Sequence, residues 1–301
     1  MQLARRLNTA EDTGHPRNLR GGGLSSQREE SVDPSADSAL AAHLLDACVR
    51  AARIGAGYIR SRTSDLHVID WQSKSRSDFV SEVDTATETR IADSLLADVP
   101  DARVLGEELS PADTPTTDSE IVFIVDPLDG TTNFLHGFPA YAVSIAALAG
   151  GHSVAGVVLQ VPHDVLFSAT RGGGAYRDGA PIRVSTISEP SRALIGTGFP
   201  FKTADELARY LPPFSRIAAQ TAGVRRAGAA ALDLADVACG RFEAFWELML
   251  APWDMAAGLL LVREAGGRVT DLQGVELKPS RSGIVASNGM MHEWMMHQLR
   301  D

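Results

Sequence analysis

The sequence has 301 residues, of which 44% are hydrophobic and 22% charged, and its formal net charge is −10. This is the balance of a globular chain long enough for about two domains. The negative charge disfavours binding to nucleic acid or to an anionic membrane, and no apolar run approaches the ~18 residues of a membrane span. Cys48 and Cys239 have no zinc or disulfide-scaffold spacing, which fits a reducing cytoplasm, and we expect no signal peptide.

The beginning of the chain differs in composition from the rest. Residues 1–35 are rich in Arg, Ser, Gly and Asn and poor in apolar side chains. Such a segment buries too little apolar surface to offset the entropy cost of ordering. We therefore predict a disordered extension over 1–35, followed by two closely joined halves over 36–184 and 185–301.

Hydrophobic periodicity predicts the elements of the first half in chain order. They are a helix through Leu40–Ile59 with Ser35 or Asp37 as N-cap, a strand at His67–Trp71, a helix at Asp84–Leu96, and strands at 103–105, 121–125, 141–148, 154–160, 165–170 and 174–177.

The second half alternates strands and helices again. The predicted elements are strands at 193–197, 223–226, 242–247 and 268–271, and helices at 205–221, 230–239 and 253–265, the last closed by Gly266 and Gly267. Elements mixed in this order predict an α/β or α+β fold with layered sheets covered by helices.

The segment 124–134 carries the strongest functional signal. A predicted buried strand delivers two acids, Asp126 and Asp129, into a turn that contains Gly130. Two acids three residues apart repel each other, and a hard cation such as Mg²⁺ relieves that repulsion through oxygen ligands. Backbone N–H groups after Gly130 can cradle a phosphate. The alternative, an ordinary Asp-Gly turn, explains less of this segment.

Acids also occur at three other predicted element ends. Glu107 and Glu108 follow a strand, Asp254 lies at a helix start after Pro252, and Asp84 opens another helix. Each has a structural alternative, a solvated loop for the glutamates and helix capping for the aspartates. No one of these three places indicates a site by itself.

Taken together, four segments resemble the inositol monophosphatase family of lithium-sensitive, magnesium-dependent sugar phosphatases. They are 78–84, 106–108, 126–134 and 252–258. The resemblance runs from about Ala36 to the end. It implies a layered αβαβα sandwich, a homodimer, and Mg²⁺-dependent hydrolysis of a small phosphate monoester with two to three ions per active site.

The resemblance also implies roles for individual residues. Metal ligands fall on Glu107, Asp126, Asp129, Asp254 and the main-chain carbonyl of Leu128. Catalytic roles in positioning a metal-activated water fall on Glu107, Thr131 and Asp84. Substrate contacts fall on Gly130, Thr131, Thr132, Gly228, Ala229 and Glu247.

The substrate is left open between several phosphate esters. Inositol monophosphate, such as myo-inositol 1-phosphate, or a similar polyol or sugar phosphate leads, with histidinol phosphate as the strongest rival. Ala251 stands where some inositol-type members carry a polar residue, which leaves the exact polyol undecided. A different class of function is a binding or regulatory protein that acts on RNA polymerase or RNA. The complete set of acids and the net charge of −10 argue against that class.

Overall fold

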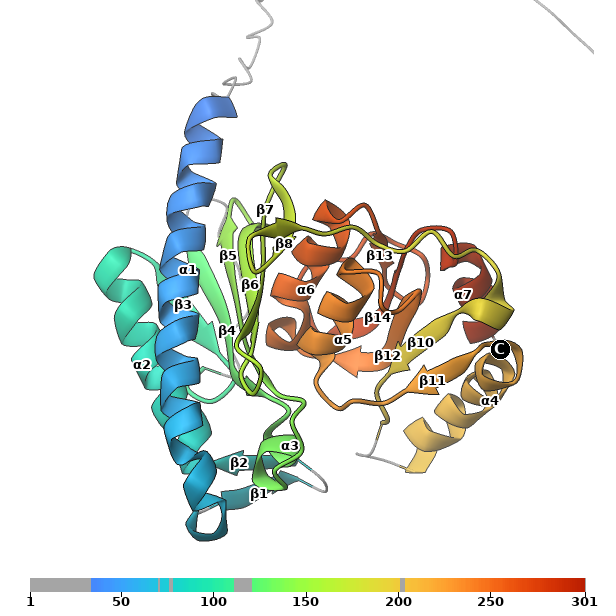
Figure 1. Cartoon of the computed structure of the whole chain (residues 1–301), viewed down its shortest axis with the longest axis horizontal. Helices are drawn as coiled ribbons and strands as arrows, with labels where there is room; N and C mark the ends of the chain where they lie inside the picture. The colour runs from blue at the N-terminus through green and yellow to red at the C-terminus, as the bar shows by residue number, and fades with distance from the viewer. Residues whose placement is uncertain (1–33, 70, 76–77, 111–120, 201–203, 301) are drawn as a thin grey trace, which may run out of the picture. The chain divides into compact units, whose positions relative to one another are not determined.

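The computed structural model describes residues 34–69, 71–75, 78–110, 121–200 and 204–300 (Figure 1). The predicted disordered extension lies outside these residues except for its last two positions, which belong to the first helix. No helix among the described residues is long and apolar enough to cross a membrane.

The described part of the chain is built in five layers, in which helices alternate with two sheets (Figure 1). This arrangement confirms the predicted αβαβα sandwich. The layers of helices are α1 (Pro34–Arg62) with α2 (Glu82–Asp98) on one side, α5 (Ala230–Ala238) with α6 (Pro252–Glu264) between the sheets, and α4 (Ala204–Gln220) with α7 (His292–Leu299) on the other side.

The large sheet separates α1 and α2 from the central helices. Its first two strands run parallel, and every later pair is antiparallel. Along one strand, Val122 and Ile124 belong to the core around α5 and α6, whereas Phe123 and Val125 belong to the core around α1 and α2. This alternation is why the strand reads as continuously apolar. In spatial order the strands are β3 (Arg103–Gly106), β4 (Val122–Asp129), β5 (Ala142–Ala149), β6 (His152–Gln160), β7 (Val165–Thr170), β8 (Gly174–Arg177) and β9 (Ala180–Pro181).

The small sheet follows the same logic on the other side of the central helices. Phe245 packs in the core around α5 and α6, while Ala244 and Trp246 pack in the core beneath α4 and α7. The strands in spatial order are β11 (Gly223–Arg225), β10 (Leu194–Thr197), β12 (Ala244–Leu250), β14 (Ser282–Ser287) and β13 (Arg268–Thr270). The predicted division between residues 184 and 185 falls between the last strand of the large sheet and the first strand of the small one.

Two local predictions are wrong. In place of the strand predicted at His67–Trp71, His67 and Val68 end a 3₁₀ helix, η1 (Thr63–Val68), in which the chain continues from α1 with a tighter turn. The strand β1 starts only at Trp71, and Asp70 lies outside the described residues. The first helix begins at Pro34, so Ser35 and Asp37 both lie in its first turn and neither is its N-cap. A second short 3₁₀ helix, η2, spans Pro190–Arg192.

Several elements were not predicted. They are the hairpin of β1 (Trp71–Ser75) and β2 (Asp78–Ser81), the short helix α3 (Thr131–Leu135), the short strand β9, and the last strand and helix, β14 and α7. In contrast, the predicted end of α6 is confirmed. Gly266 adopts φ 89°, and the N–H groups of Gly266 and Gly267 bond to the carbonyls of Arg263 and Val262.

Candidate active site

The central strand β4 delivers the two acids of the strongest motif. Its pairing with β5 shifts between Asp126 and Asp129, so the chain bulges where these acids lie. Every residue of the strand is buried. Gly130 follows with φ 92°, and a Cβ atom there would lie 2.8 Å from the carbonyl oxygen of Ala140. Only glycine therefore fits this turn.

Asp84 and Thr131, which are far apart in sequence, meet beside this turn. The Thr131 hydroxyl lies 2.8 Å from Asp84 Oδ1 and 3.1 Å from the carbonyl oxygen of Leu128. The other carboxylate oxygen of Asp84 accepts the backbone N–H of Ser81 at 2.9 Å and its hydroxyl at 2.5 Å. Asp84 thus caps α2, as the structural alternative proposed, and also contacts Thr131.

Asp254 likewise has two relationships. It is the third residue of α6, and its Oδ2 accepts the N–H of Ala251 at 2.6 Å. This contact is a helix cap. The same carboxyl group is also close enough to Asp126 to raise the pKa of that group. The first turn of α6 therefore holds Asp254 beside the end of β4.

The start of α5 binds the second acid of the motif. Asp129 accepts the N–H of Ala230 at 3.2 Å and that of Ala231 at 2.8 Å. The unpaired N–H groups at a helix start attract a carboxylate through the helix dipole as well as through hydrogen bonds. These contacts connect the large sheet directly to the central helices.

Asn133 fixes the loop that carries two of the predicted substrate contacts. Its amide lies 2.9 Å from the carbonyl oxygen of Ala227 and 3.3 Å from that of Gly228. Gly228 has φ 87° and is followed by Ala229, the buried N-cap residue of α5. The predicted contacts Gly130, Gly228 and Ala229 therefore lie on segments joined through Asn133. Thr132, in contrast, lies exposed in the first turn of α3.

Four acids gather at this place, and we call Glu107, Asp126, Asp129 and Asp254 the acidic cluster. Burial raises the pKa of Asp126 well above its usual range, and the charges of the three other members raise it further. Burial raises the pKa of Asp129 to about 7, against the opposing effect of its backbone N–H partners. Burial and the charges of Glu107 and Asp129 raise the pKa of Asp254. These shifts record the repulsion of like charges removed from water.

The acidic cluster fits a divalent cation by its chemistry. Its side chains offer only oxygen donors, which hard cations such as Mg²⁺ prefer, and its ionised form needs an opposing charge. Among the described residues, no three His, Cys, Asp or Glu side chains form a ready-made metal site. Asp126, Asp129 and Asp254 each accept a hydrogen bond from a backbone N–H group, so one oxygen of each of these acids is directed towards the main chain.

Glu247 lies next to the acidic cluster on the small sheet. It is half-buried in β12, and a Cβ atom on Gly198 would overlap its carboxylate, so the two residues are in close contact. Its charge contributes to the raised pKa of Asp254 and to that of Asp233. The structure therefore places this predicted substrate contact beside the predicted metal ligands.

Asp233 was not predicted as part of the site. It lies in the first turn of α5, is 2% exposed, and its Oδ1 has no hydrogen-bond partner in the described part of the chain. Burial raises its pKa well above the usual range, and the charges of Asp129 and Glu247 add to that shift. In the sequence it looked like one more polar residue of a helix.

Glu88 is the second residue that was missed. It is 1% exposed, and its carboxylate accepts the N–H of Glu108 at 2.7 Å and that of Leu109 at 2.9 Å. It therefore fixes the turn that presents Glu107. Its spacing of four residues from Asp84 places both acids on one helix face, and this is the signal that could have identified it.

Comparisons with known proteins find similar sequences and a similar structure. A model of the inositol monophosphatase family matches residues 41–301. The chain is 44% identical over 247 residues to the Nus factor SuhB of Pseudomonas aeruginosa, covering 81% of this chain and 91% of the relative. It is 46% identical over 216 residues to the inositol-1-monophosphatase of Rhizobium meliloti, covering 71% and 80%. The crystal structure of the extragenic suppressor protein suhB from Bartonella henselae matches with a TM-score of 0.80 at 39% identity, covering 85% of this chain and 98% of that one.

Proposed function

Since the chain belongs to the inositol monophosphatase family, we propose that it hydrolyses a small phosphate monoester with Mg²⁺ held by the acidic cluster. The observation that carries this proposal is the burial of like charges at one place. Three of the four acids have raised pKa values because they lie out of water and near one another. A fold retains such repulsion at a cost in stability, and this cost is offset when a cation binds.

The chain's own residues would hold and orient the reactants. Glu107, Asp126, Asp129, Asp254 and the Leu128 carbonyl would ligate two to three ions. When bound, these ions supply positive charge that stabilises the phosphate and the leaving oxygen and that activates water. Because the Thr131 hydroxyl donates its hydrogen bond to Asp84 or Leu128, its lone pairs can accept a hydrogen bond from the attacking water.

The phosphate would bind at the turn after β4. The left-handed conformation of Gly130 and the start of α3 bring backbone N–H groups together there. Glu247 would accept hydrogen bonds from the hydroxyls of a polyol, with Gly228 and Ala229 lining the same pocket. Inositol monophosphate or a similar polyol phosphate suits these acceptors, and the Rhizobium relative is named for that activity.

A turnover panel tests the proposal. Phosphate release from myo-inositol 1-phosphate, histidinol phosphate and fructose 1,6-bisphosphate would be measured with Mg²⁺, with and without Li⁺. We expect the highest kcat/KM for the inositol ester and inhibition by Li⁺. A higher kcat/KM for histidinol phosphate would contradict the proposed substrate but would leave the proposed metal mechanism in place.

The variant Asp126→Asn tests the mechanism itself. It keeps the shape of the side chain and an oxygen for the Leu128 N–H, and we expect turnover to fall on the order of a hundred- to a thousandfold. Asp46→Asn, at an exposed position of α1, is the matched control. Full turnover by Asp126→Asn would contradict the metal mechanism.

A second candidate is a role without catalysis. The Pseudomonas relative is named a Nus factor, so a regulatory role in which the chain acts on RNA polymerase or RNA remains a separate proposal. The Asp126→Asn variant separates the two. The variant would be expressed in a strain that lacks this protein. If the inactive variant restores wild-type growth, the regulatory role is favoured; if it does not, the phosphatase is favoured.

A further inference from the structure

A second charged site lies at the opposite end of the helix that carries Asp254. A cavity of about 340 Å³ is bordered by the β5–β6 turn at His152, by Arg171 after β7, by the last turn of α6, and by the segment that contains Lys278. Arg263 borders this cavity from α6, nine residues after Asp254. That spacing corresponds to about 14 Å along a helix axis, so the cavity is separate from the acidic cluster.

The cavity gathers cations, although the chain as a whole has a net charge of −10. Arg171, Arg263 and Lys278 all line it. Two acids also line it, and one of them, Glu264, uses both carboxylate oxygens to accept the N–H groups of Gly172 and Gly174. That contact fixes the β7–β8 turn, which directly follows Arg171.

The other acid only partly balances the charge. Glu276 lies 3.5 Å from Arg263, but its side chain is 83% exposed, so water screens the pair. The Arg263 guanidinium also donates to the carbonyl oxygen of Leu277. Arg171 and Lys278 are both exposed around the cavity.

The positive field of the cavity acts on its neighbours. Burial lowers the pKa of Arg263; the charge of Glu276 opposes this shift, and that of Arg171 adds to it. Burial also lowers the pKa of His152, and the charges of Arg171 and Lys278 add to that effect, while Glu276 again opposes it. Like charges therefore repel one another here as they do in the acidic cluster, with the opposite sign.

We propose that this cavity binds a phosphate-bearing anion at a site separate from the substrate. Guanidinium groups pair with phosphate oxygens through two parallel hydrogen bonds, and an ammonium group adds a point charge. Arg171, Arg263 and Lys278 line the cavity from three different segments of the chain, so their charges surround it from more than one side. The volume of about 340 Å³ admits a phosphate group with a small organic part attached.

Thermal unfolding with inorganic phosphate tests the site. The titration would be run in chelator, where the acidic cluster repels anions, and at constant ionic strength against chloride. We expect phosphate to raise the Tm of the wild-type chain by about 2–3 °C. The shift should fall in Arg171→Ala and vanish in Arg171→Ala/Lys278→Ala, two exposed positions whose replacement leaves the core intact. Arg192→Ala, in which an arginine with a 69% exposed side chain is removed elsewhere, is the control and should keep the full shift.

His152 provides a second measurement within the same cavity. Its imidazole resonances would be followed by NMR against pH and assigned with His152→Gln. Bound phosphate offsets the positive field, so the pKa of His152 should rise in the wild-type chain and stay unchanged in Arg171→Ala/Lys278→Ala. An equal Tm shift in all variants, or a His152 titration that phosphate leaves unchanged, would overturn the proposal.

Discussion

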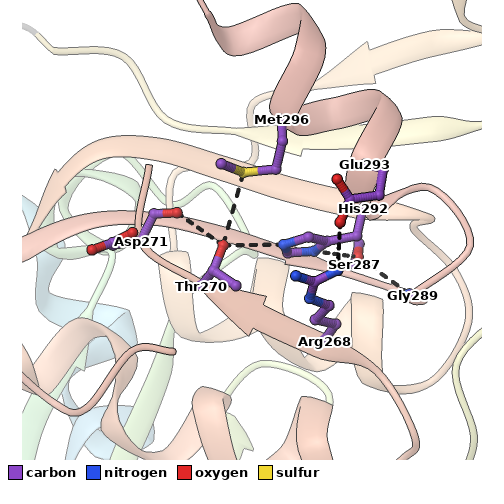
Figure 2. Close-up of polar contacts among 8 residues, drawn as sticks. All are labelled: Arg268, Thr270, Asp271, Ser287, Gly289, His292, Glu293 and Met296. Atoms are coloured by element: carbon purple, nitrogen blue, oxygen red, sulfur yellow. Dashed lines mark hydrogen bonds and ion pairs between the residues drawn. The ribbon is translucent and has the colours of Figure 1, made fainter. Parts of the chain in front are cut away.

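The acidic cluster and the surroundings of His292 both bury polar groups, but they satisfy them differently. Figure 2 shows the imidazole of His292 between two hydroxyls, with Ser287 Oγ 2.9 Å from Nδ1 and Thr270 Oγ1 3.0 Å from Nε2. Thr270 in turn donates to the carbonyl oxygen of Asp271 at 2.8 Å, and the N–H of Gly289 donates to Ser287. Each polar atom of the imidazole has a partner within the chain. We call Thr270, Ser287 and His292 the imidazole network.

Structural and functional polar groups can be distinguished by whether the chain itself supplies their partners and opposing charges. The imidazole network is neutral and complete, so it orders the packing of α7 against β13 and β14 without any ligand. Three acids of the acidic cluster accept backbone N–H groups, but the negative charges of the cluster repel one another. A buried polar group that lacks a partner or an opposing charge costs stability, and a chain retains it where a ligand supplies what is missing.

The largest expected effect concerns Asp129 in the metal-free protein. Its folded-state pKa of about 7 lies above the reference value of 3.8, so the folded state binds more protons between these two pH values. Stability should therefore rise as pH falls from 7 to 4, by roughly 4 kcal/mol from this group. Urea denaturation in chelator at several pH values measures it.

The control for this effect is Asp129→Asn, which removes the titrating group. The difference between the wild-type and variant stabilities should follow the window from pH 7 to 4 and flatten outside it. An identical pH dependence in both chains would show that Asp129 is ionised in the folded metal-free protein.

The next largest effect has the opposite sign and belongs to the imidazole network. Burial and the nearby Arg268 lower the pKa of His292 to about 4, although Glu293 opposes this. The unfolded chain therefore binds more protons than the folded chain between pH 6.5 and 4. The free energy of unfolding should decrease by roughly 3 kcal/mol as pH falls from 6.5 to 4. Protonation would place a charge on a ring that is fully buried.

His292→Gln separates this effect from that of the acids. The variant should be less stable at pH 7.5, because the hydroxyls of Thr270 and Ser287 lose their imidazole partner. It should not show the further loss of stability that the wild-type chain shows as pH falls from 6.5 to 4. Turnover per folded molecule should stay unchanged, since His292 lies outside the acidic cluster. A wild-type stability that follows the same pH curve as the variant would contradict a neutral buried imidazole.

Sequence patterns predicted the features that depend only on residues close together in the chain. The apolar strand before Asp126 and the turn at Gly130 follow from neighbouring residues, and so does the glycine closure of α6. The roles of the individual cluster acids came from resemblance to a family. The structure adds that Asp84 and Asp254 each cap a helix and also approach the site.

The remaining features depend on contacts between distant residues. Glu88 reaches backbone groups 20 and 21 positions away, and Thr270 meets His292 across 22 positions. The spacing of four residues from Asp84 places Glu88 on the helix face of a candidate site residue, but it does not show which backbone N–H groups the carboxylate accepts. The strand predicted at His67–Trp71 failed for a related reason, since a short apolar stretch suits a 3₁₀ turn or a strand until its neighbours are placed.

Addition of Mg²⁺ should supply the opposing charge that the acidic cluster needs and the imidazole network does not. A cation that binds only the folded state raises its stability by about 2.7 kcal/mol at one hundred times Kd. The rise should appear in the wild-type chain and in His292→Gln, and it should be much smaller in Asp126→Asn. Thermal unfolding across a Mg²⁺ series with Ca²⁺ as a comparison measures it. Equal stabilisation of Asp126→Asn would place the ion outside the acidic cluster.

The smallest expected effect comes from the ion pair at the edge of the imidazole network. Arg268 and Glu293 lie 2.6 Å apart, but their side chains are 49% and 74% exposed (Figure 2). Solvent screening limits such a pair to about 0.5 kcal/mol, so Glu293→Gln should hardly change stability at pH 7.5. The substitution leaves Arg268 unopposed near His292, and the acid-side loss of stability should then extend over a wider pH range. A large loss at pH 7.5 with no change in the acid limb would mean that Glu293 acts through packing and not through its charge.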